Sequence, residues 1–118
     1  MTTTTRRIKE TGSLFLTCGV QHYLETGCLP YSTDEHNSEH TEAWRRHFIA
    51  VAWTSHMSGS WGDTSADDAA MNDEVFRAAD GGRLLSSWER SGFPKLWIIT
   101  DAYGRPEAYS TILFPSEY

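Results

Sequence analysis

The stretch Lys95-Leu-Trp-Ile-Ile-Thr100 decides the fold, because it is a strand-type run of β-branched and aromatic residues. Two further runs of the same type flank it, Arg83-Leu-Leu-Ser-Ser-Trp88 and Tyr109-Ser-Thr-Ile-Leu-Phe114. Short segments of turn composition separate the three runs, and linkers this short force neighbouring strands to run antiparallel. Because no polar residue interrupts residues 96–99, we expect both faces of the middle strand to be covered.

Upstream of these runs the chain alternates between helical and turn patterns. Leu14-Phe-Leu-Thr17 predicts a short strand, and Thr41 and Ser65 are suitable N-caps for two helices. The predicted helices cover residues 20–25, 42–57 and about 66–80. The whole pattern predicts a single α+β domain over residues 13–118, in which two or three helices pack on a three- to four-stranded antiparallel sheet. Residues 1–12 are expected to be a flexible tail, and residues 29–40 a flexible loop.

The apolar residues of the two longer helices predict which faces are buried. The helix over residues 42–57 has two apolar faces, one with Trp44, Phe48 and Val51 and the other with Ile49, Trp53 and Met57. Either this helix is covered on both sides, or its second face, with Ile49 and Trp53, contacts a second copy or another partner. The last helix shows a single apolar stripe, made of Met71, Val75, Phe76 and Ala79.

Composition and charge exclude several classes of protein. The 118 residues carry 10 basic and 16 acidic side chains, a formal net charge of −6, and 13% of them are aromatic. The aromatic content excludes intrinsic disorder, and the acid excess argues against direct nucleic-acid binding. No apolar run is long enough to span a bilayer, and the first residues lack the apolar region of a signal peptide. We therefore expect a cytoplasmic protein without membrane contact.

Two cysteines and two nearby histidines are the candidate metal ligands. Cys18 and Cys28 do not form a Cys-x-x-Cys motif, and His36 and His40 lie four residues apart in a polar stretch. One interpretation is a zinc site built from these four residues. The other is ordinary thiols and solvated histidines, and on that interpretation we expect no metal and no cofactor.

Catalytic patterns are weak in this sequence. It contains no Gly-x-Ser-x-Gly elbow, no phosphate-binding loop and no His-Glu-x-x-His motif. The best single candidate is Asp63, with His56 a short distance upstream. A loop aspartate before a helix more often caps or turns the chain than catalyses a reaction. We therefore expect no catalytic residues and no enzymatic activity.

Several segments in the second half of the chain resemble a group of short bacterial proteins carried by plasmids and prophages. The segments are His56-Met-Ser-Gly-Ser-Trp-Gly-Asp63, Asp67-Asp68, Asn72, Arg83-Leu-Leu-Ser86, Lys95-Leu-Trp-Ile-Ile-Thr-Asp101 and Thr111-Ile-Leu-Phe-Pro-Ser-Glu-Tyr118. Relatives usually carry an acid where this chain has Ser60, and tyrosine where it has Trp88. The resemblance implies a mobile genetic element and the cytoplasm of a bacterial host, and it implies no particular activity.

The acidic residues suggest where a partner would bind. Between Trp61 and Arg90 there are seven acids and three arginines, so this region contributes 3 − 7 = −4 to the net charge. Our main hypothesis is a non-enzymatic inhibitor, of the anti-CRISPR or another counter-defence type, that blocks a basic nucleic-acid-handling protein. Its expected contact residues are Trp61, Asp63, Asp67, Asp73, Glu74, Ile49 and Trp53. The alternatives are a zinc-stabilised protein or small enzyme, and a homodimeric module joined through Ile49 and Trp53.

Overall fold

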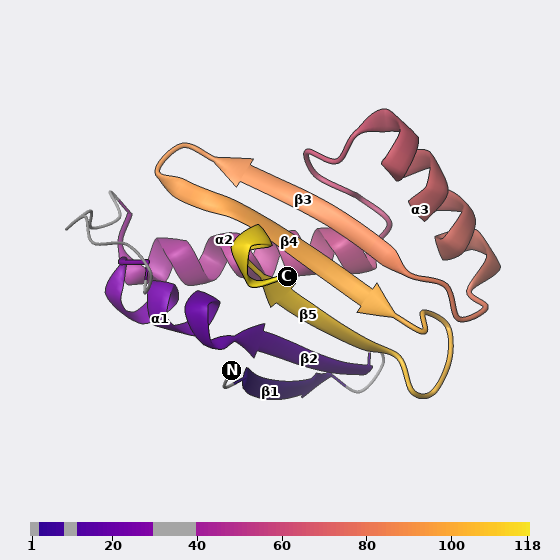
Figure 1. Ribbon diagram of the computed structural model, residues 1–118, viewed down its shortest axis with the longest axis horizontal. Helices are drawn as coiled ribbons and strands as arrows, with labels where there is room; N and C mark the ends of the chain where they lie inside the picture. Colours follow the sequence, from indigo (N-terminus) through magenta and orange to yellow (C-terminus); the bar gives the residue numbers. More distant parts are fainter. Residues whose placement is uncertain (1–2, 9–11, 30–39) are drawn as a thin grey trace.

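The computed structural model describes residues 3–8, 12–29 and 40–118. In this part of the chain it contains three α-helices, five strands and one short 3₁₀ helix (Figure 1). In chain order these are β1 (Thr3–Ile8), β2 (Gly12–Thr17), α1 (Cys18–Thr26), α2 (Glu42–Met57), α3 (Ala66–Ala78), β3 (Leu84–Arg90), β4 (Phe93–Asp101), β5 (Tyr109–Leu113) and η1 (Pro115–Glu117). The predicted α+β class is confirmed.

The predicted helix starts are confirmed by their caps. The Thr41 hydroxyl accepts a hydrogen bond from the backbone N–H of Trp44 at 3.1 Å, and Ser65 accepts one from Asp68 at 3.3 Å. Helix α2 has the predicted bounds. These starts could be predicted because a cap and the helix it serves are neighbours in the sequence.

The sheet is larger than expected, and it is mixed. Its strand order is β1-β2-β5-β4-β3, and β2 pairs with β5 in parallel while the other described pairings are antiparallel. Residues 3–8, expected to be part of a flexible tail, form β1 and pair with β2 along its length. Strand β5, the last in the sequence, is therefore the central strand, between the pair β1–β2 and the hairpin β3–β4.

Helix α2 covers one face of this sheet, α1 lies at one end and α3 lies beside β3 (Figure 1). The core between α2 and the sheet is built from residues that alternate along the strands. It includes Leu14, Phe48, Ile49, Ala52, Trp53, Trp88, Leu96, Ile98 and Ile112. On the opposite face, η1 and the C-terminal residue are the described parts of the chain that lie over the sheet (Figure 1).

The inward face of α2 is one stripe rather than two. Its buried residues are Arg45, Phe48, Ile49, Ala52, Trp53 and His56, which follow the three- and four-residue spacing of a single helical face. Val51, expected on one of two apolar faces, is 45% exposed, whereas the polar Arg45 and His56 are buried. Ile49 and Trp53 are only 7% and 8% exposed, so the predicted partner surface at these two residues is wrong.

Candidate functional site

Helix α3 is attached to the sheet through a buried asparagine. Asn72 is the one buried residue of α3, and its side chain bonds both backbone groups of Leu85. The amide nitrogen donates to the Leu85 carbonyl at 2.6 Å, and the amide oxygen accepts from the Leu85 N–H at 3.1 Å. This contact turns the Asn72 side of α3 toward the sheet. Met71, which was predicted to face the core, therefore lies on the outer side of the helix and is 66% exposed.

The turn before α3 bonds the same edge of β3 further along. Asp63 donates its backbone N–H to the Ser87 carbonyl at 2.7 Å and accepts from the Glu89 N–H through its carboxylate at 2.8 Å. The Thr64 hydroxyl accepts from the Ser87 N–H at 2.9 Å. Gly62 has a φ of +61°, and an added Cβ would lie 2.7 Å from the Ser87 carbonyl oxygen, so glycine is needed here.

Together these contacts provide hydrogen-bond partners for the backbone groups on the outer edge of β3. Residues 85, 87 and 89 turn their backbone groups away from β4, and Asn72, Asp63 and Thr64 bond five of the six groups. The sixth, the Glu89 carbonyl, accepts from the Arg90 guanidinium at 2.7 Å. We call residues 62–64 with Asn72 the edge cap. It closes an edge that would otherwise be open to strand addition.

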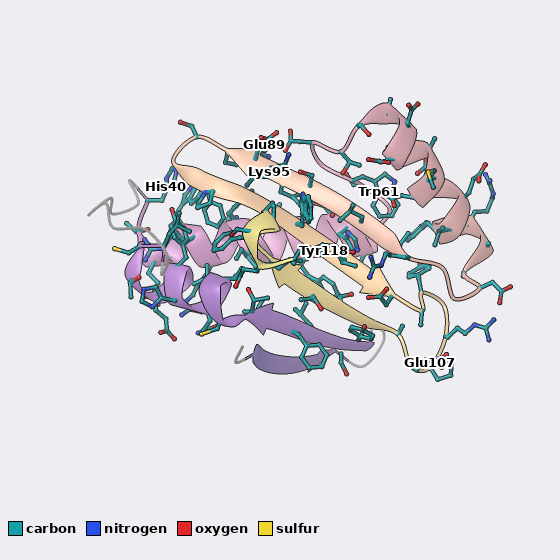
Figure 2. All side chains as sticks on the ribbon, viewed as in Figure 1. His40, Trp61, Glu89, Lys95, Glu107 and Tyr118 are labelled. Atoms are coloured by element: carbon teal, nitrogen blue, oxygen red, sulfur yellow. The ribbon has the colours of Figure 1, made fainter. Side chains whose placement is uncertain are left out.

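Three predicted contact residues therefore have structural roles. Trp61 is 7% exposed and lies between α3 and β3, where its indole N–H donates to the Asp73 carboxylate at 2.8 Å (Figure 2). Asp63 belongs to the edge cap. The prediction that Trp61 contacts a partner is wrong, because this side chain is buried. Asp63 and Asp73 each accept a hydrogen bond within the chain but are exposed, so their contact with a partner stays a prediction.

Two further predicted contact residues also lie on the surface. Asp67 and Glu74 are exposed, and Met71 lies between them at helical positions i, i+4 and i+7, which share one face. We call Asp67, Met71 and Glu74 the α3 stripe. Among the described residues neither carboxylate has an ion-pair partner. The exposed Asp68 lies next to the stripe. Sequence reasoning identified both acids of the stripe but placed the methionine on the wrong face.

His56 is at the centre of a hydrogen-bond network in the core. Its Nδ1 lies 2.7 Å from the Ser86 hydroxyl and its Nε2 2.8 Å from the Thr100 hydroxyl. The Trp88 indole N–H donates to the same Ser86 oxygen, and the Thr100 hydroxyl bonds Ser110 at 2.6 Å. A neutral imidazole in either tautomer completes this chain, since it offers one donor and one acceptor.

This network is buried, and its environment disfavours charge. His56, Ser86, Thr100 and Ser110 are each 0% exposed. Burial lowers the pKa of His56 from its ordinary 6.5 to about 4, so the ring is neutral at pH 7. Although a serine beside a histidine is a pattern of nucleophilic catalysis, a fully buried pair offers a substrate no access.

The structure does not bring His56 and Asp63 together as a catalytic pair. Both ring nitrogens of His56 are bonded to Ser86 and Thr100, and the Asp63 carboxylate is bonded to the edge of β3. Asp63 also lies 3.9 Å from the Arg90 guanidinium, an exposed ion pair that contributes little to stability. In this geometry both His56 and Asp63 have structural roles.

The candidate metal ligands are also separated. Cys18 begins α1 and Cys28 follows its end, so a helix about 13 Å long divides the two thiols. His40 is stacked on Trp44 at 3.5 Å, and its Nε2 lies 2.8 Å from the Ser91 carbonyl oxygen. His36 lies outside the described residues. Within the described ranges no three potential ligands are grouped closely enough to hold a metal ion.

Comparisons with known proteins add no assignment to this geometry. No protein-family model matches the chain, and searches of curated proteins and of solved structures give no match either. The resemblance to plasmid and prophage proteins therefore stays a prediction. None of the helices in residues 12–29 and 40–118 is long and apolar enough to cross a membrane.

Proposed function

We propose that this protein is a non-enzymatic binding protein whose α3 stripe docks onto a basic surface of another protein. The observation that carries the proposal is the exposure of Met71, 66%, between two carboxylates on one helical face. An exposed apolar side chain flanked by acids fits a partner surface that combines aliphatic and basic groups.

The charges around the stripe support a basic partner. Two of the three arginines in residues 61–90 lie beside acids outside α3: Arg83 pairs with Asp101 at 2.8 Å, and Arg90 lies near Asp63. Asp80 pairs with Arg105 at 2.8 Å. The acids of the α3 stripe have no such neighbour among the described residues, so they remain available to a basic partner.

The biological role we propose is that of an accessory protein of a mobile genetic element in a bacterial cytoplasm. Proteins that handle nucleic acids present basic surfaces to phosphates, and an acidic helix can cover such a surface. On this proposal the protein inhibits a host system, as anti-CRISPR and other counter-defence proteins do, by steric and electrostatic block.

Charge reversal on α3 tests the proposal. The variant Asp67→Lys/Glu74→Lys is compared with the wild type and with a matched variant, Glu25→Lys/Glu107→Lys, which reverses two exposed acids elsewhere. Each protein is used to capture partners from host lysate, and the captured protein is identified, purified and titrated. We expect the α3 variant to bind this partner about 5- to 30-fold more weakly, because two charge pairs are lost at about 0.5–1 kcal/mol each.

The control variant keeps the same net charge as the α3 variant, so it separates a local contact from a general charge effect. It is expected to bind as the wild type does. A Met71→Glu variant, which keeps both acids and removes the apolar contact, should also weaken binding. Equal affinity of the wild type and the α3 variant for the partner would remove the α3 stripe from the proposal.

A further inference from the structure

The two edges of the sheet end differently. At one edge, the edge cap and Arg90 bond the outward backbone groups of β3. At the other edge β1 is the last strand, so no described strand pairs with its outer side. In Figure 1 β1 forms the lower border of the described molecule, and no described helix or strand lies beyond it. The described part of the chain therefore covers the edge of β3 and leaves the edge of β1 open.

Half of the backbone groups of β1 point away from β2. In an antiparallel pair every second residue bonds the neighbouring strand, and the residues between turn their N–H and C=O groups outward. The six residues of β1 pair with β2 along its whole length. Three of the six therefore turn their backbone groups to the open side, the same number as on the outer edge of β3. An extended segment can bond such groups as an added strand.

Positive charge distinguishes the edge of β1 within an acidic protein. The chain has a net charge of −6, yet β1 contains two arginines, Arg6 and Arg7, and no acid. Its neighbour β2 contains no charged residue, so the adjacent strand does not compensate this charge. Opposite charges on paired strands attract, and like charges repel. An added strand with two adjacent acids can place one acid opposite each arginine position.

The same charges favour another protein over a second copy of this chain. If two β1 strands paired antiparallel over their whole length, Arg6 of one copy would lie opposite Thr5 of the other. Four arginines would then lie within six residue pairs and repel each other. In addition, none of the five described strands carries two adjacent acids. The complementary strand is therefore expected in a partner of different sequence.

We propose that the outer edge of β1 binds, by strand addition, an extended segment of another protein that carries two adjacent acids. Backbone hydrogen bonds to β1 provide affinity, and the two arginines select the acidic sequence. This proposal goes beyond the function proposed above and uses a different surface. Strands β1 and β3 are at opposite ends of the sheet, and α3 lies beside β3, so both surfaces can be occupied at the same time (Figure 1).

Peptides of fixed sequence test the charge selection. The probe is the fluorescein-labelled peptide Thr-Val-Glu-Glu-Val-Thr, blocked at both ends, and its control has two lysines in place of the two glutamates. Both are titrated with the full chain, and fluorescence anisotropy measures binding. We expect saturable binding of the glutamate peptide and at least about fivefold weaker binding of the lysine peptide, because two exposed charge pairs are lost.

Methylated peptides test whether binding occurs by strand addition. Every second N–H of an added strand points to its neighbour, so methylation of alternate peptide nitrogens blocks either the set that faces β1 or the set that faces solvent. Two glutamate peptides with the two alternate patterns are compared. One should lose binding and the other should keep it, a difference that charge attraction alone cannot produce.

Charge exchange on the protein identifies the site. The variant Arg6→Glu/Arg7→Glu should bind the lysine peptide more tightly than the glutamate peptide, a gain that misfolding cannot produce. The matched control Arg46→Glu/Arg77→Glu reverses two exposed arginines on α2 and α3 and should keep the wild-type preference. The α3 variant described above should also bind the glutamate peptide as the wild type does, which separates this proposal from the one on the α3 stripe.

Three outcomes would overturn the proposal. The first is no saturable binding of the glutamate peptide up to ~1 mM, the weak limit of specific recognition. The arginines would then only protect the edge against unwanted pairing. The second is equal binding of the two methylated peptides, and the third is an Arg6→Glu/Arg7→Glu variant that still prefers the glutamate peptide.

Discussion

His56 shows how one residue can be polar in the sequence and part of the core in the structure. Both of its ring nitrogens are bonded, to hydroxyls on β3 and β4, and the Ser110 hydroxyl on β5 extends the chain. A buried imidazole without these partners would cost free energy, whereas a fully bonded one fixes how α2 lies on the sheet. The network therefore acts as a positioning device between helix and sheet.

The lowered pKa of His56 predicts how stability depends on pH. Because the folded-state value, about 4, lies below the ordinary 6.5, the unfolded chain takes up a proton first as the pH falls. The stabilisation is complete above pH 6.5 and is lost as the pH falls toward 4. We expect this group to remove about 3 kcal/mol from the free energy of unfolding over that interval. Urea unfolding at several pH values measures it.

Substitution of His56 tests whether this residue causes the loss of stability at low pH. His56→Gln removes the titrating group but keeps a side chain that can donate and accept hydrogen bonds, so we expect a flatter dependence of stability on pH. His47→Gln, on the exposed side of α2, should keep the wild-type dependence. An unchanged dependence in His56→Gln would show that other groups cause the acid sensitivity.

At the scale of elements, the edge cap explains why a glycine, an aspartate and a threonine follow Trp61 in the sequence. Glycine provides the positive φ, and three side chains replace the hydrogen bonds that a neighbouring strand would make to β3. In the sequence the same residue types also suit a binding turn, because each of them can contact a partner. Their partners on β3 lie far away in the sequence, so no local pattern could separate the two interpretations.

The edge cap predicts a large effect of a small substitution. Asn72→Ala leaves the N–H and the carbonyl of Leu85 without partners, and we expect it to lower the free energy of unfolding by about 2 kcal/mol or more. The neighbouring Met71→Ala changes an exposed side chain and should stay within about 0.5 kcal/mol of the wild type. Urea titrations followed by tryptophan fluorescence compare the two variants. Equal midpoints for Asn72→Ala and Met71→Ala would contradict this role.

At the scale of the whole molecule, the two halves of the chain are joined near the C-terminal 3₁₀ helix. The Glu117 carboxylate accepts hydrogen bonds from the Thr17 hydroxyl at 2.7 Å, the Gly19 N–H at 3.1 Å and the Phe114 N–H at 2.9 Å. An acid at this place also faces the positive end of the α1 dipole. Glu117 therefore connects β2 and α1 with the segment that follows β5.

Removal of this carboxylate should weaken the connection. We expect Glu117→Ala to destabilise the protein by about 1–3 kcal/mol, because hydrogen bonds to a charged group are lost and the Gly19 N–H loses its acceptor. Hydrogen exchange should increase most in the first turn of α1. Glu107→Ala, at an exposed loop position, serves as the control. Unchanged exchange in α1 would show that Glu117 does not connect these segments.

The sequence predicted the local parts of this molecule and missed its long-range parts. Helix α2 and the caps at Thr41 and Ser65 follow from neighbouring residues, so their prediction is confirmed. Strand β1 and the parallel pairing of β2 with β5 depend on contacts between distant segments, which periodicity does not reveal. The same limit applies to the candidate site: the exposed acids of α3 could be predicted, while the burial of Trp53 and Trp61 could not.

The parallel pairing of β2 with β5 has a consequence for synthesis. During translation β2 emerges early together with β1, but its parallel partner β5 follows only after three helices and two strands have been made. At about 5–20 residues per second, the edge of β2 that pairs with β5 waits for several seconds without this strand. The nascent chain therefore cannot assemble the central part of its sheet until β5 has left the ribosome, and its early segments depend on chaperones or on their own solubility until then.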